Sequence, residues 1–206
     1  MKPNLKLPGT EQRLEQAGHA ACSDTALLVE VALSASPKFP CDVLELGCGA
    51  GLAALQLQLA RPQWRVSGLE LQPHLADIAR RNAGALGLPL RVHTADLRSW
   101  VSSRQFHIIA ANPPHIPVSQ GRLPLDHARA LARHELACTM DDVVAALSRL
   151  LSPSGQAWLL YPQSRCDELH GVCRQRRLDI FTVKHQPKGH TAVFGLRQSH
   201  ANARTA

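Results

Sequence analysis

The chain of 206 residues predicts a doubly wound α/β fold with a mostly parallel sheet. Three observations support this prediction. Short aliphatic runs of strand length alternate with amphipathic helical runs along most of the chain. A dense glycine cluster follows the first strand-like run, and an Asn-Pro-Pro sequence follows the fourth. We expect one domain over 1–198, with a helical lid segment at 1–38 and a disordered tail at 199–206.

The predicted elements follow one another in the order that such a fold requires. The strands are expected at 41–46, 65–70, 90–95, 106–111, 156–161, 178–184 and 191–197. Helices are expected from about Leu52, Leu75, Met140 and Cys166, where apolar residues recur at helical spacing. Gly87 and Pro89 are typical of a helix end. Pro153, Ser154 and Gly155 predict a turn before the fifth strand.

The composition narrows the class of protein. No stretch approaches the roughly 20 apolar residues that span a bilayer, and charged residues interrupt the first twenty positions as they would not in a secretory signal. We therefore expect a soluble, cytoplasmic protein. The formal net charge of +7 would attract a polyanion such as RNA, although a solvated basic surface explains it equally well.

Cysteine and histidine spacing argues against a metal site or a disulfide framework. The six cysteines contain no C-x-x-C pair, and no histidines stand at the spacing H-E-x-x-H. His134 and Glu135 begin that pattern, but Cys138 stands where the second histidine is needed. We expect no metal.

The segment from Glu45 to Gly51 reads E-x-G-x-G-x-G, where a strand turns into a helix. Glycines there allow a sharp turn and a close approach to a ligand. The dinucleotide pattern G-x-G-x-x-G is not met, because Leu52 stands where its third glycine would fall. The spacing instead resembles the first motif of class I S-adenosylmethionine methyltransferases. That resemblance assigns a set of residues to this cofactor: Glu45, Gly47, Cys48, Gly49 and Gly51.

Two acids end the next two strands. Glu70 lies about 20 residues after the glycine cluster, where an acid accepts both ribose hydroxyls in nucleotide-binding folds, with Leu71 beside it. The family position that accepts from the cofactor's adenine amine matches Asp96, with Leu97 beside it. The alternatives are a solvated strand end for Glu70 and a helix N-cap for Asp96.

The sequence Asn112-Pro113-Pro114-His115 follows the fourth predicted strand. It resembles the Asn-Pro-Pro-aromatic motif of methyltransferases that act on amines conjugated to planar groups: adenine N6, cytosine N4 and glutamine N5. The resemblance places Asn112 at both cofactor and target, and its side-chain oxygen and the Pro113 carbonyl would each accept an N–H of the target amine. His115 stands where the family has tyrosine, phenylalanine or tryptophan, which leaves the target base open.

Two further segments resemble bacterial tRNA adenine-N6 methyltransferases that modify A37 of a valine tRNA. They are 23–28 and 129–135, and the resemblance extends over roughly 23–162. We expect Asp24 to close over the cofactor. The net charge of +7 leads to the hypothesis that Arg129 and Arg133 contact RNA, although 129–135 could also be an ordinary polar helix end. The resemblance also implies a Rossmann-like sheet of seven strands, helices on both faces and an antiparallel last pair.

Three functions remain open at this point. The first is methylation of an adenine N6 in tRNA, and the second is methylation of a glutamine N5 in a protein. Enzymes of the second kind usually carry an N-terminal helical domain, and about 40 residues precede the first strand here. The third is a non-catalytic RNA-binding member of the fold, which His115 permits but the glycines and Asn112 disfavour. The oligomeric state is not predicted.

Overall fold

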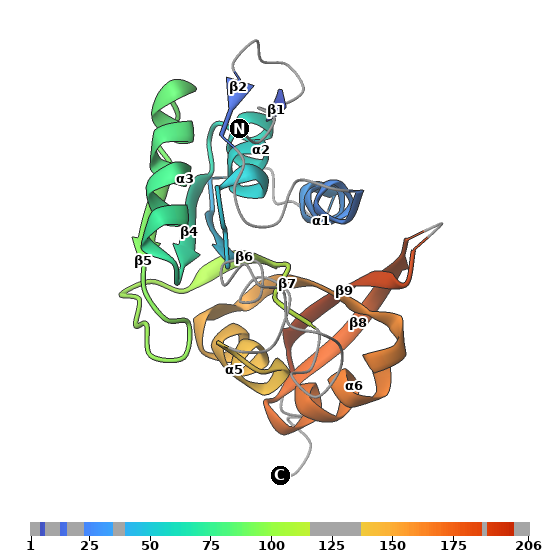
Figure 1. Ribbon diagram of the computed structural model, residues 1–206. Coiled ribbons are helices and arrows are strands. Elements are labelled where there is room, and N and C mark those ends of the chain that lie inside the picture. The colour runs from blue at the N-terminus through green and yellow to red at the C-terminus, as the bar shows by residue number, and fades with distance from the viewer. Residues whose placement is uncertain are drawn as a thin grey trace.

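The computed structural model describes residues 5–6, 13–15, 23–34, 40–115, 137–186 and 189–199. Most strands form one seven-stranded sheet in the order β5-β4-β3-β6-β7-β9-β8 (Figure 1). Its strands are β3 (Asp42–Leu46), β4 (Arg65–Glu70), β5 (Arg91–Thr94), β6 (Phe106–Ala111), β7 (Leu151–Pro162), β8 (Leu178–His185) and β9 (Thr191–Gln198). A separate two-stranded sheet pairs β1 (Leu5–Lys6) with β2 (Arg13–Leu14).

The strand directions confirm the predicted fold class. β3 lies between β4 and β6 and is parallel to both, with Val43 opposite Val66 on one side and Ile108 on the other. The β4–β5 and β6–β7 pairs are also parallel. β9 is antiparallel to both of its neighbours, β7 and β8. The sheet is therefore mostly parallel, and the last strand pair is antiparallel as expected.

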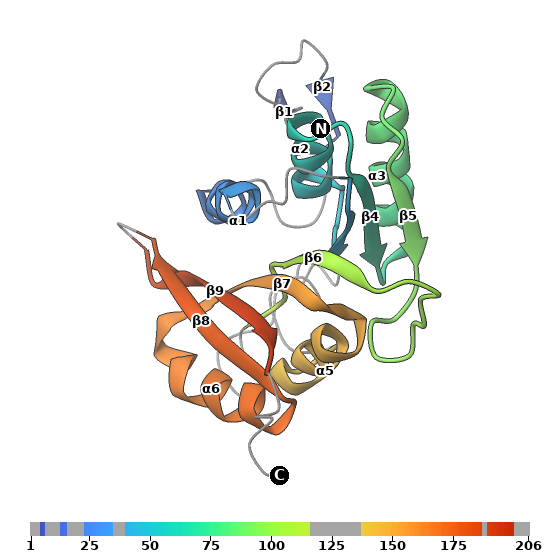
Figure 2. The same ribbon diagram turned by 180° about the vertical axis from the view of Figure 1, so that it is seen from behind.

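Helices cover both faces of this sheet. They are α1 (Ser23–Ser34), α2 (Leu52–Ala60), α3 (Pro73–Ala85), α5 (Met140–Leu150) and α6 (Cys166–Gln175), and a short 3-10 helix, η1 (Gln163–Arg165), precedes α6. Figures 1 and 2 show α1 and α2 on one side of the sheet and α5 and α6 on the other. None of the helices in the described ranges is long and apolar enough to cross a membrane.

A hydrophobic core lies on each face of the sheet. Neighbouring residues of a strand pack into different cores, because side chains alternate between the two faces. Val43 packs with α1 and α2, whereas Leu44 packs with α5 and α6. Ile108 and Ile109 divide between the two cores in the same way. Strands buried on both faces are mostly apolar, which is why β3 and β6 are mostly aliphatic in the sequence, with Asp42, Glu45 and His107 as the polar exceptions.

Local signals set several helix ends. Pro73 is the first residue of α3, and Gly87 follows its end with a φ of 63°, as the predicted stop requires. Thr139 and Asp142 form a capping box at the start of α5, where each residue's side chain accepts from the other's backbone amide.

The predicted turn at 153–155 is wrong. These residues lie within β7, which runs on without a break from the end of α5. Phe106 of β6 pairs with Leu151, but Ile108 pairs with Gln156, so β7 bulges by three residues. Gly155 allows the bulge to close on β6, because a Cβ there would lie 2.9 Å from the Phe106 carbonyl oxygen.

Candidate functional site

A cavity of about 450 Å³ opens beyond the carboxyl ends of β3, β4 and β6. Its volume lies within the range of roughly 300–1,000 Å³ that is usual for small-molecule sites. Ligands of doubly wound folds bind at this edge, where the strand order reverses. The predicted residues that line it are Asp24, Glu45, Gly47, Cys48, Gly49, Glu70, Leu71, Asp96, Leu97, Asn112, Pro113, Pro114 and His115.

The glycine loop packs directly on β4. The amides of Gly47 and Cys48 both donate to the carbonyl oxygen of Leu69, at 2.8 and 3.0 Å. Gly68 makes room for this loop, because a Cβ at that position would lie 2.6 Å from the Cys48 sulfur. Burial raises the pKa of the Cys48 thiol, so this thiol is a packing group and not a reactive thiolate.

Gly51 is the one described residue of the predicted set outside the cavity lining. Its φ is +83°, and a Cβ there would lie 3.0 Å from the Cβ of Ala79 in α3. This glycine precedes α2 as its N-cap residue. Its position explains the close approach of the start of α2 to α3, and a contact of Gly51 with the cofactor stays a prediction.

Glu45 extends from β3 to the first turn of α2. Its Oε2 accepts from the Ala54 amide at 2.7 Å, which satisfies one of the amides that a helix start leaves unpaired. The residue is 6% exposed. Burial raises the pKa of the Glu45 carboxyl to about 8, although the Ala54 hydrogen bond acts in the opposite direction. A cationic ligand group in the cavity would stabilise the charged form.

Glu70 joins the end of β4 to the glycine loop. Its two oxygens accept from the amides of Gly49 and Gln72, each at 2.8 Å. These bonds fix the orientation of a carboxylate that is itself buried. Because each carboxylate oxygen can accept more than one hydrogen bond, the group keeps the capacity to bind two hydroxyls.

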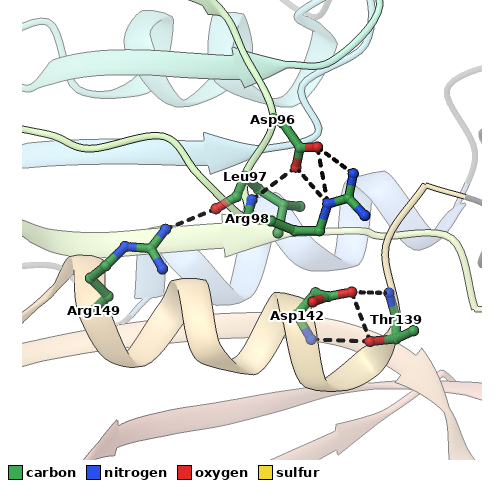
Figure 3. Close-up of polar contacts among 6 residues, drawn as sticks. All are labelled: Asp96, Leu97, Arg98, Thr139, Asp142 and Arg149. Atoms are coloured by element: carbon green, nitrogen blue, oxygen red, sulfur yellow. Dashed lines mark hydrogen bonds and ion pairs between the residues drawn. The ribbon is translucent and has the colours of Figure 1, made fainter.

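Asp96 and Leu97 lie on the loop after β5 (Figure 3). The Asp96 carboxylate accepts from the Arg98 guanidinium and from the Arg98 amide, and the guanidinium hydrogen bond lowers the pKa of Asp96. Residues 97–99 form a turn and not a helix, so Asp96 is not a helix N-cap. Arg149 of α5 donates to the carbonyl oxygens of Leu97 and Trp100, at 2.8 and 3.2 Å. The loop on the predicted adenine side is therefore anchored to α5.

The loop of residues 112–115, here called the Asn-Pro-Pro-His loop, directly continues β6. The His115 Nδ1 lies 3.3 Å from the Pro113 carbonyl oxygen. The His115 ring meets the buried Tyr161 ring edge-on, with 6.1 Å between their centroids. The loop thus holds an amide side chain, a carbonyl and an imidazole at one end of the cavity.

Asp24 lies in the first turn of α1 and is held by the β8–β9 hairpin. Its Oδ1 accepts from the Thr191 hydroxyl at 3.0 Å and from the side-chain Nε2 of Gln186 at 3.2 Å. These bonds hold an acid in the cavity lining. The predicted RNA contacts Arg129 and Arg133 lie outside the described residues.

Sequence patterns missed part of the lining. Gln72 could have been inferred, because it follows the predicted ribose acid by two positions. Cys138 and Val143 also line the cavity, but they come from α5 and the residues before it. No local pattern marks them, since only the position of α5 on the sheet brings them there. Across the described ranges, no group of three or more His, Cys, Asp or Glu could hold a metal ion.

Residues 22–160 match the family described as "Methyltransferase small domain". The chain belongs to this family. The match includes the glycine loop, both strand-end acids and the Asn-Pro-Pro-His loop.

Proteins similar in sequence to this chain include two kinds of methyltransferase. A tRNA1(Val) (adenine(37)-N6)-methyltransferase of Porphyromonas gingivalis is 33% identical over 75% of this chain and 65% of its own length. A release factor glutamine methyltransferase of Enterococcus faecalis is 37% identical over 45% of this chain and 34% of its own. The chain thus spans just under two thirds of the tRNA methyltransferases it matches.

A solved ribosomal protein L11 methylase of Lactobacillus delbrueckii subsp. bulgaricus has a similar fold. The TM-score is 0.64 at 16% identity, covering 85% of this chain and 79% of that one. At this identity the likeness establishes the fold alone.

The family implies S-adenosylmethionine as cofactor, and the cavity fits such a molecule. Its floor is a glycine loop without side chains at Gly47 and Gly49, where added Cβ atoms would meet nothing within 4 Å. Carboxylates of Glu45, Glu70 and Asp96 face one cavity. They suit a ligand that carries an ammonium, ribose hydroxyls and an adenine amine, and they would repel a pyrophosphate.

Proposed function

We propose that this protein methylates the N6 amine of an adenine in RNA, with tRNA as the substrate class. One observation carries the proposal: the Asn-Pro-Pro-His loop lines the same cavity as the glycine loop, Glu70 and Asp96. A target amine held by that loop would therefore lie next to a cofactor held by the other three. The tRNA methyltransferase that is similar over 75% of the chain supports RNA as the target.

Different residues of the chain would bind different parts of the cofactor. Glu70 would hold the ribose hydroxyls, and Asp96 with Leu97 would hold the adenine. Glu45 and Asp24 would face its amino-acid portion. S-adenosylmethionine supplies an electrophilic methyl group on a sulfonium, and the remaining catalytic work is to present the amine.

An adenine amine is a poor nucleophile because its lone pair is delocalised into the ring. The Asn112 side-chain oxygen and the Pro113 carbonyl oxygen are two acceptors that can each bind one N–H of that amine. Binding both would favour a pyramidal nitrogen and direct its lone pair at the methyl group. Positioning and electrostatics of this kind supply most of the acceleration, so a strong general base is not required.

His115 would stack on the target base in place of the usual aromatic residue. His115→Tyr tests this role in single-turnover assays on adenine-containing RNA. Tyrosine should preserve or raise the rate if the imidazole serves as a stacking surface. Loss of activity in His115→Tyr would instead indicate a specific polar role for the imidazole.

The experiment that tests the function is mass spectrometry of nucleosides. Purified protein with S-adenosylmethionine should convert adenosine to N6-methyladenosine in tRNA from a strain that lacks the protein. A release factor substrate is tested in parallel, because a release factor glutamine methyltransferase is 37% identical over 45% of the chain. Methylglutamine in that protein, with unmodified tRNA, would overturn the proposal. We also propose a cytoplasmic location, where tRNA is the available substrate. Arg129 and Arg133 remain the predicted RNA contacts.

A further inference from the structure

The Asn-Pro-Pro-His loop depends on outside groups for its shape. Pro113 and Pro114 have no amide hydrogen, and the loop has no regular secondary structure. Neighbouring elements can therefore hold the two prolines only through their carbonyl oxygens, whereas Asn112 and His115 also have backbone amides. A small displacement of the loop would move both proposed acceptors of the target amine.

Arg165, the last residue of η1, supplies a donor to this loop. Its Nη1 donates to the His115 carbonyl oxygen at 3.1 Å. The contact follows from the sheet, because β7 pairs with β6 and Ala111 lies opposite Leu159. Residues that follow β7 are thereby brought beside the loop that follows β6. The Arg165 guanidinium also lies 5.3 Å from the centroid of the Tyr161 ring, which in turn meets the His115 ring.

Arg165 is itself fixed in place. Its Nε and Nη2 donate to the two carboxylate oxygens of Glu168, at 2.8 and 2.7 Å. The Arg165 side chain is 14% exposed, whereas the Glu168 side chain is 51% exposed, so the guanidinium is the buried partner of the pair. A guanidinium can bind a carboxylate along one edge and still direct a third N–H elsewhere, which a single ammonium cannot do in fixed geometry.

We propose that Arg165 is a positioning residue for methyl transfer. By holding the His115 carbonyl, it sets where the Pro113 carbonyl and the His115 imidazole lie in the cavity. Glu168 acts through Arg165 by fixing the guanidinium. The proposal rests on the proposed function, because its effect on rate is read as methyl transfer to an amine.

The test compares Arg165→Met and Arg165→Lys with a matched control, Arg176→Met. Arg176 forms the same kind of two-point pair with Asp141, between the end of α6 and α5. All three variants should bind S-adenosylmethionine with wild-type affinity. Single-turnover methyl transfer should fall about 10²-fold in Arg165→Met, the cost of a displacement near 1 Å, and should recover only in part in Arg165→Lys. Arg176→Met should keep the wild-type rate.

A second readout needs no substrate. The imidazole resonance of His115, identified by its loss in His115→Tyr, should shift in both Arg165 variants and stay in place in Arg176→Met. Should Arg165→Met fail to fold, Arg165→Lys and Glu168→Gln carry the same comparison and should both lower the rate.

Two results would overturn the positioning role. One is wild-type turnover with an unshifted His115 resonance in the Arg165 variants. The other is a loss of rate in Arg176→Met equal to that in Arg165→Met, which would indicate a general loss of stability. A wild-type protein inactive on both RNA and protein substrates would overturn the proposed function instead, and the His115 resonance would still test the positioning.

Discussion

At the residue scale, the Glu45 side chain caps the start of α2 and also lines the cavity. Its buried carboxyl caps the Ala54 amide and has a pKa of about 8, against an ordinary value of 4.5. The sequence motif marks this acid as a cofactor residue. It does not reveal the cap, because that contact depends on how α2 folds back over β3.

The raised pKa of Glu45 predicts how stability depends on pH. The folded state binds this proton more tightly than the unfolded chain, so its stabilising effect is complete below about pH 4.5 and is lost as pH rises through about 8. Without cofactor, wild type minus Glu45→Gln should therefore show a larger free energy of unfolding at the acidic end of this window. Urea titrations at both ends measure it. Arg65 and Arg98 lower the pKa values of Asp42 and Asp96, so these two acids make stability depend on pH in the opposite direction. Subtracting the free energy of Glu45→Gln from that of wild type cancels their effect. A difference that grows with pH would contradict the assignment.

Glu70 should contribute directly to cofactor affinity. Glu70→Ala should weaken S-adenosylmethionine binding by about 1.5–3 kcal/mol, the range for hydrogen bonds to a charged group. Calorimetry measures this affinity. NAD serves as a control ligand, which neither the wild type nor Glu70→Ala should bind. Unchanged affinity in the variant would remove Glu70 from the ribose role.

At the scale of elements, contacts between residues far apart in the sequence determine features that local sequence patterns do not reveal. Residues 153–155 carry a local turn signal, yet pairing of β7 with β6 and β9 keeps them in the strand as a bulge. Most other boundaries agree with the sequence within a residue or two, because apolar spacing, Pro73 and Gly87 mark them locally. Arg149 and Arg165 could not have been selected from the sequence. Their partners Leu97 and His115 lie about 50 residues away and meet them only in the folded sheet.

The anchor between α5 and the loop after β5 leads to a prediction of its own. Arg149→Met removes the donor to the Leu97 and Trp100 carbonyls, in the loop that is predicted to bind the cofactor's adenine. Two such hydrogen bonds are together worth about 1–3 kcal/mol. Affinity for S-adenosylmethionine should therefore fall by about tenfold, with a smaller effect on turnover at saturating cofactor. Calorimetry and initial rates measure the two. A loss confined to turnover would show that Arg149 does not act on the cofactor side.

At the scale of the whole molecule, the sequence predicted both the sheet and the position of the cavity. Glu70 is the last residue of a strand, whereas the glycine loop, Asp96 and Asn112 come after strands, and a parallel sheet brings its strand ends to one edge. The part of the wall built by α5 was not predicted, because helix placement on a sheet has no short sequence pattern.

The net charge of +7 predicts a salt dependence for the proposed RNA complex. Affinity for tRNA should fall steeply between about 50 and 200 mM salt, because each neutralised phosphate releases counterions. Arg133→Gln should reduce the slope of log affinity against log salt by about one unit if that arginine contacts a phosphate. Fluorescence anisotropy measures both. A wild-type affinity that does not change with salt would point to a protein substrate.

Asn112→Ala in a single-turnover methylation assay tests the central claim most directly. If the Asn112 oxygen binds the target amine most strongly as the nitrogen becomes pyramidal, its loss should reduce turnover and leave cofactor affinity nearly unchanged. The rate should fall by on the order of 10²–10³-fold, as when one preorganised polar partner of a transition state is removed. Melting temperature and calorimetry with S-adenosylmethionine serve as controls for folding and binding. An Asn112→Ala protein that methylates adenine at the wild-type rate would contradict the mechanism, and the assignment to an amine target with it.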